Sequence, residues 1–165
     1  MNTFFNDREM EGRYAWMMLN MKDILRGKKR IDFTLDPFCT FDFEMTAWTS
    51  SVDFEMTAWT LSATTSYGEI KTIHRDYTKY DNFMFDYMKG KRLQNKARED
   101  NRKAYVVGFF DDYTLVWDIT EMNLEERKYT QFCTTTTANY EKGKEEKEEI
   151  WLTKEEAIYK EERKK

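Results

Sequence analysis

The chain has 165 residues, a formal net charge of −4, 35% charged residues and 16% aromatic residues. This length is enough for one hydrophobic core, so we expect residues 1–165 to form a single domain. The aromatic content argues against a disordered chain. The negative net charge argues against a protein that binds nucleic acid through a strongly basic surface.

The cysteines and the hydropathy indicate the cellular compartment of the protein. Its two cysteines, Cys39 and Cys133, form neither a disulfide framework nor a zinc-binding pattern, which fits a reducing compartment. No apolar run approaches membrane-spanning length, and the N-terminus lacks the pattern of a signal peptide. We therefore expect a cytoplasmic protein with no membrane partner.

A predicted helix and a predicted strand come first along the chain. From Asp7 to about Leu25, apolar side chains recur at helical spacing and predict an amphipathic helix. Glu11 flanks its apolar face. Residues 29–38 alternate between polar and apolar side chains and predict a strand. This strand should end at Asp36 and Pro37, because proline is poorly accommodated inside a sheet.

Residues 41–62 contain a tandem duplication of eleven residues. The copies, 41–51 and 52–62, share the sequence DFEMTAWT. Because eleven is odd, Asp42 and Asp53 would point to opposite faces of one continuous strand. Both can face one site only if the chain turns or bulges between them, and we expect this near Ser50 and Ser51. Removal of either copy would leave an ordinary hairpin.

The second copy and the residues after it predict a hairpin that carries acidic side chains. Residues 53–60 and 67–73 alternate as strands do, with 61–66 as the connection. In this register Asp53 faces Glu69, and Lys71 shares their face. Facing carboxylates repel each other, and a hard divalent cation, which prefers carboxylate oxygens, would offset the repulsion. The register favours Asp53, whereas the preceding strand leads directly into Asp42, which is the alternative.

An aspartate followed at hairpin distance by Glu69-Ile70-Lys71 resembles the PD-(D/E)XK nuclease superfamily. The resemblance spans roughly residues 41–120. One departure is that Phe41 and Val52, not proline, precede the two aspartates. The resemblance implies a restriction-endonuclease-like fold of the α+β or α/β class, with a mixed central sheet flanked by helices. It also implies hydrolysis of phosphodiester bonds in DNA with Mg²⁺, for which Mn²⁺ could substitute.

The resemblance further implies roles for individual residues. The implied metal ligands are Asp53 or Asp42, Glu69, the carbonyl oxygen of Ile70, and Glu11. Lys71 would stabilise the charge that develops on the phosphate. Lys89, at the start of the next predicted helix, would lean into the site. DNA is the implied partner, and a homodimer is compatible with the sequence.

The rest of the chain predicts scaffold. A polar helix is expected over 88–101, a buried strand over 104–110 and a return strand over 114–119. Residues 141–149 predict a solvated loop or a hairpin tip, and Thr153 to Glu156 form a capping-box pattern that predicts a terminal helix. Two alternatives to a nuclease stay open: an inactive nuclease-like module that binds nucleic acid or protein, and a structural domain in which Glu69 and Lys71 form a surface ion pair.

Overall fold

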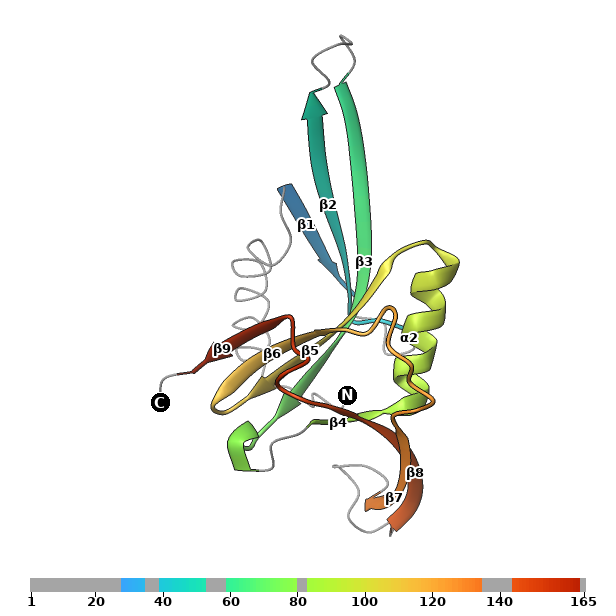
Figure 1. The fold of residues 1–165 in the computed structure, drawn as a ribbon, viewed down its shortest axis with the longest axis vertical. Coiled ribbons are helices and arrows are strands. Elements are labelled where there is room, and N and C mark those ends of the chain that lie inside the picture. Colours follow the sequence, from blue (N-terminus) through green and yellow to red (C-terminus); the bar gives the residue numbers. More distant parts are fainter. Residues whose placement is uncertain (1–27, 35–38, 53–58, 80–82, 135–143, 164–165) are drawn as a thin grey trace.

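Strands make up most of the part of the chain that the computed structural model in Figure 1 describes. The structure describes residues 28–34, 39–52, 59–79, 83–134 and 144–163. In this part of the chain there are a mixed sheet, a second smaller sheet and one α-helix. The prediction of a mixed α/β protein is therefore confirmed. The helix predicted over 7–25 lies outside the described residues.

The larger sheet has the strand order β1-β2-β3-β5-β6-β9. Its strands are β1 (Lys28–Phe33), β2 (Phe43–Val52), β3 (Trp59–Ile73), β5 (Lys103–Phe110), β6 (Tyr113–Asp118) and β9 (Tyr159–Glu162). β1, β2 and β3 are antiparallel, whereas β5 joins β3 in parallel. The strands predicted over 29–38, 104–110 and 114–119 correspond to β1, β5 and β6.

The parallel pairing of β3 with β5 requires a crossover connection. This connection contains the short 3-10 helix η1 (Tyr77–Lys79), β4 (Phe83–Asp86) and α2 (Tyr87–Glu99). The Asp86 carboxylate caps α2 by accepting a 2.8 Å hydrogen bond from the backbone N–H of Lys89. The cap fixes where α2 begins and places Lys89 in its first turn. Among the described residues, neither α2 nor any other helix is long enough and apolar enough to cross a membrane.

A smaller sheet lies beside α2, in the order β4-β8-β7. β7 covers Lys128–Thr134 and β8 covers Lys144–Leu152. The prediction of a solvated loop or a hairpin tip over 141–149 is wrong for residues 144–149, because β8 begins at Lys144, and residues 141–143 lie outside the described residues. Phe83, Phe85, Ile150 and Leu152 are buried in a core shared with α2 and with one face of the larger sheet.

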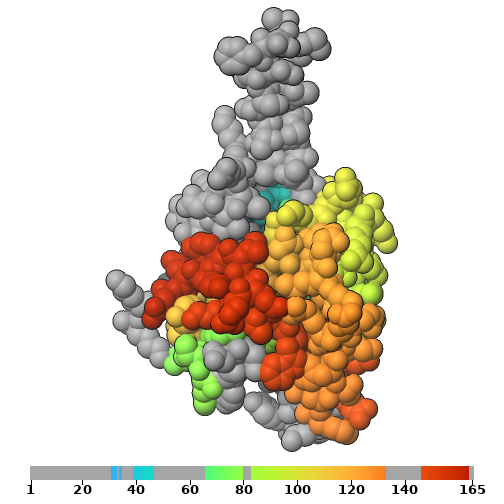
Figure 2. Space-filling model, viewed as in Figure 1, coloured from blue at the N-terminus to red at the C-terminus, as the bar shows by residue number. Residues whose placement is uncertain are grey.

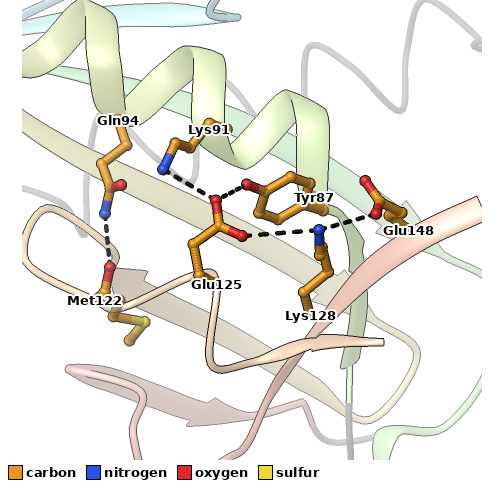
Figure 3. A network of polar contacts seen from close by, with 7 residues as sticks. All are labelled: Tyr87, Lys91, Gln94, Met122, Glu125, Lys128 and Glu148. Atoms are coloured by element: carbon orange, nitrogen blue, oxygen red, sulfur yellow. Dashed lines mark hydrogen bonds and ion pairs between the residues drawn. The ribbon is translucent and has the colours of Figure 1, made fainter. Parts of the chain in front are cut away.

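A polar network fixes α2 against the segment that follows β6 (Figure 3). The Gln94 side chain donates hydrogen bonds of 2.8 and 2.9 Å to the carbonyl oxygens of Ile119 and Met122. The Glu125 carboxylate has three partners on α2 and β7, namely Tyr87, Lys91 and Lys128. Because Gln94 is buried, its side-chain amide requires such hydrogen-bond partners.

The C-terminal segment packs against the same loop, and Figure 2 shows the two side by side on one face. Glu156 forms an ion pair with Arg127, and its carboxylate accepts bonds of 3.1 and 2.9 Å from the N–H and hydroxyl of Thr153. The predicted terminal helix is wrong, because this segment turns and then forms β9. Thr153 and Glu156 do bond to each other, but they close a turn that Arg127 anchors.

The hairpin register also differs from the prediction. Residues 61–66 lie within β3 and do not form a connection, and Ser50 and Ser51 lie within β2 and do not form a turn. β2 and β3 pair continuously from Phe43↔Gly68 to Val52↔Trp59. The second copy of the duplication therefore lengthens both arms of one hairpin, because its first residue ends β2 and its last four begin β3.

Two buried clusters cover the two faces of the larger sheet. One cluster contains Val106, Phe110 and Trp117 and lies on the side of α2. The other contains Phe43 and Met45. The ring of Phe43 occupies the space that a side chain at position 68 would need, so only glycine fits opposite it.

Substitution of Gly68 by alanine should destabilise the protein by about 1–3 kcal/mol, because the added methyl group overlaps the buried Phe43 ring. Urea unfolding measures the loss. Gly90→Ala is the matched control, because its nearest side-chain atom would be 3.2 Å away and alanine favours helices. Equal effects of the two substitutions would contradict the packing described for Phe43.

Candidate functional site

Asp42 and Glu69 meet where β2 begins beside β3. The pairing of β2 with β3 begins at Phe43↔Gly68. A 2.8 Å hydrogen bond from the Asp42 N–H to the Gly68 carbonyl oxygen extends it by one residue. The Asp42 carboxylate then accepts a 2.6 Å hydrogen bond from the Ile70 N–H. These two bonds hold the Asp42 side chain over the strand that carries Glu69.

Two lysines converge on the Glu69 carboxylate. The ammonium group of Lys71, two residues along β3, lies 2.7 Å from Oε1 of Glu69. The ammonium group of Lys89, from the first turn of α2, lies 3.2 Å from the same oxygen. Glu69 is buried, with 7% of its surface exposed, and a buried carboxylate requires such partners. The side chains of Lys71 and Lys89 are 31% and 53% exposed, so both ammonium groups can be reached from solvent.

The charges of this cluster act strongly on Asp42. Burial and, as the second cause, the negative charge of Glu69 together raise the pKa of Asp42 from 3.8 to about 6. The Ile70 N–H and the two lysines oppose the change. Burial, the largest single cause, lowers the pKa of Lys89, but the charge of Glu69, the hydrogen bond to Glu69 and the smaller contributions of Lys71 and Asp42 together raise it. Burial beside the Glu69 carboxylate thus disfavours the ionised form of Asp42.

Aromatic and basic residues support the strand ends beside the site. Phe41 stacks on Tyr67, with ring centroids 4.2 Å apart, and so anchors the residue before Asp42. Arg102 lies over the Tyr67 ring at 4.6 Å and forms an ion pair with Glu44. This ion pair neutralises the carboxylate two residues beyond Asp42. Sequence reasoning missed Phe41 and Arg102, because nothing local links residues 41 and 102.

The structure brings together four of the residues that the sequence singled out: Asp42, Glu69, Lys71 and Lys89. Ile70 joins them through its backbone N–H. Asp53 and Glu11 lie outside the described residues. The prediction that hairpin pairing sets Asp53 opposite Glu69 is wrong, because Phe43 pairs with Gly68 and Asp42 therefore occupies that position.

Asp42 and Glu69 are the two carboxylates from which a metal site could be built. Within the described ranges, no group of three or more histidine, cysteine, aspartate or glutamate residues is arranged to hold a metal ion. Two carboxylates that face each other, one with a raised pKa, nevertheless provide the hard oxygen donors that Mg²⁺ and Mn²⁺ prefer. Comparison with family models, curated proteins and solved structures gave no match.

Deletion of residues 52–62 should leave the fold and the site intact. Trp48 already pairs with Ala63, so the shortened hairpin would close through residues 49–51, a usual loop length. Asp42 would remain beside Ile70. The expected result is cooperative unfolding together with an Ile70 amide that stays protected from hydrogen exchange. Loss of that protection in a folded protein would show that the register at the site depends on the second copy.

Asp42→Asn should stabilise the protein at neutral pH. The amide oxygen can still accept from the Ile70 N–H, but it carries no charge to repel Glu69. In wild type, the folded state holds the Asp42 proton up to about pH 6, whereas the unfolded chain releases it near 3.8. The stability that this proton confers is complete below about pH 4 and is lost as the pH rises to about 6.

The unfolding free energy of wild type relative to Asp42→Asn should therefore fall between pH 4 and 6, by at most about 3 kcal/mol. Urea unfolding in a chelator at pH 4, 5, 6 and 7 measures this difference. Asp118→Asn is a matched control, because Asp118 pairs with Lys103 at the beginning of β5, whereas Glu69 pairs with Val106. A difference from Asp42→Asn that does not vary with pH would contradict the raised pKa that burial and the charge of Glu69 give Asp42.

Proposed function

We propose that the protein is a metal-dependent nuclease that hydrolyses phosphodiester bonds in DNA, with a restriction-endonuclease-like fold. The observation that carries this proposal is the convergence of Asp42, Glu69, Lys71 and Lys89 on one face of the sheet. The strand order supports it as well. Three antiparallel strands, a crossover helix and a parallel strand bring together the motif residues and the helix lysine that the PD-(D/E)XK resemblance implies.

The donor set fits a hard divalent cation. Asp42 and Glu69 would hold it, because their mutual repulsion is relieved when a cation lies between them. When bound, Mg²⁺ supplies charge neutralisation at the scissile phosphate and activation of a water molecule. Candidate ligands outside the described residues would add to this pair.

Binding of a DNA phosphate by the two lysines would release Glu69 from its ion pairs. Lys71 and Lys89 share one oxygen of Glu69 and are both reachable from solvent. A DNA phosphate offers several oxygens to the same ammonium groups, so it competes with Glu69 for them. As the lysines turn to the phosphate, Glu69 loses its cationic partners and becomes available as a metal ligand. Lys71 is then placed to stabilise negative charge on the phosphate during reaction.

A second candidate function is a binding module with the same fold and no turnover. The observation that favours it is the pairing of Glu69 with two lysines, which satisfies this buried carboxylate without a metal ion. The two candidates differ in one measurable respect. Binding of Mn²⁺ without DNA cleavage supports the module, whereas cleavage supports the nuclease.

Purified protein should cleave DNA with Mg²⁺ or Mn²⁺ and not in a chelator. Asp42→Asn and Glu69→Gln should each lower the cleavage rate by at least about 100-fold, because each removes a proposed metal ligand, and Lys71→Met by about 100- to 1,000-fold. Gel assays on plasmid and on linear DNA measure these rates. Calorimetric titration with Mn²⁺ separates loss of metal binding in the two carboxylate variants from loss of chemistry in Lys71→Met.

Two matched controls sharpen the assay. Lys91→Met removes a lysine from the same helix as Lys89, but Lys91 pairs with Glu125 away from the site, so cleavage should be unchanged. Asp53→Asn should also cleave normally, because Asp42 lies beside Glu69. Cleavage that survives Glu69→Gln, or that is lost in Asp53→Asn and kept in Asp42→Asn, would overturn this assignment.

A further inference from the structure

The β2–β3 hairpin extends beyond the rest of the larger sheet (Figure 1). β1 pairs with β2 only as far as Trp48, and β5 pairs with β3 only from Ser66 onward. Beyond these points, residues 49–52 and 59–65 pair with each other, and no other described strand pairs with them. The outer part of the hairpin is therefore a two-stranded ribbon.

This ribbon leaves a long strand edge open. Residues 59–65 of β3 pair with β2 along one edge, and along the other edge no strand in the described part of the chain pairs with them. Backbone N–H and C=O groups along such an edge form a template for pairing with another strand. A two-stranded ribbon is also marginally stable in water on its own. Both considerations indicate a partner.

The chemistry of the ribbon indicates which partner it suits. Residues 56–68 contain no charged residue and no proline, and neither do residues 45–52. By contrast, β1 (KKRIDF) and β9 (YKEE), the outermost strands of the larger sheet, carry the charges that usually discourage edge pairing. A ribbon without cations offers nothing to neutralise DNA phosphates. The edge therefore fits a protein strand better than nucleic acid.

We propose that a second copy of this chain pairs with the ribbon, with the 59–65 segments of the two copies antiparallel across a twofold axis. Identical edges related by a twofold axis form a closed, self-complementary interface. An uncharged edge allows two chains of net charge −4 to approach there without like charges meeting. The result is a four-stranded ribbon, β2-β3-β3-β2, that joins two domains.

The test is the molar mass of the full chain in solution, measured by light scattering after size exclusion over a range of concentrations. Wild type should have twice the mass of one chain. In Ser62→Lys/Thr64→Lys, lysines from the two copies would face one another, so this variant should be monomeric. Ser62→Glu/Thr64→Glu should also be monomeric. An equimolar mixture of the two variants should regain the dimer, which a misfolded ribbon would not do.

Two further variants define the interface. Thr130→Lys adds a lysine to β7, the outermost strand of the smaller sheet, and should leave the dimer unchanged. Deletion of residues 52–62 removes most of the open edge and should give a monomer. Wild type that is monomeric at every concentration, a dimer that survives the paired lysines, or a mixture that fails to reassociate would each overturn the proposal.

Discussion

The pairing of Phe43 with Gly68 is the constraint on which the candidate site depends. Because the Phe43 ring fills the space above Gly68, these two residues must lie opposite each other. A slip of one residue would place a side chain under the ring and turn Asp42 away from Glu69, since side chains alternate along a strand. Core packing on one face of the sheet thus fixes the position of a carboxylate on the other face.

Local signals explain which elements the sequence predicted, and the duplication explains why the site aspartate could not be predicted. α2, β5 and β6 follow from strong local signals: the Asp86 cap, a continuous apolar run and its return strand. The choice between Asp42 and Asp53 had no local signal, because eight residues are repeated without change. Packing against Gly68, which lies far along the chain, decides which copy begins β2. Eleven added residues lengthen both arms of the hairpin, so their odd number does not disturb the pairing at its base.

Other differences arise where a local motif is used for another purpose. Thr153 and Glu156 form the hydrogen bonds of a capping box, yet the next residues pair with β6 as β9. Arg127, distant in sequence, forms an ion pair with Glu156. This ion pair holds the turn in place, although no helix follows it. Similarly, the charged residues of 144–149 suggested a loop or a hairpin tip, but alternate positions of β8 can face solvent while Ile150 and Leu152 are buried. The sequence patterns identified the polar contacts and the exposed face correctly, but tertiary packing determined whether the backbone forms a helix, a loop or a strand.

The crossover between β3 and β5 has a consequence for how the protein folds. The pair Phe43↔Gly68 closes within one hairpin, whereas Ser66↔Lys103 requires the whole segment containing β4 and α2 to return to the sheet. Contacts between residues close in sequence lose less chain entropy and usually form earlier. Asp42, Glu69 and Lys71 therefore meet in the hairpin, and Lys89 arrives only when α2 docks. A folding intermediate that contains the hairpin alone would carry two carboxylates and one lysine. The second positive charge, that of Lys89, would be added when α2 docks.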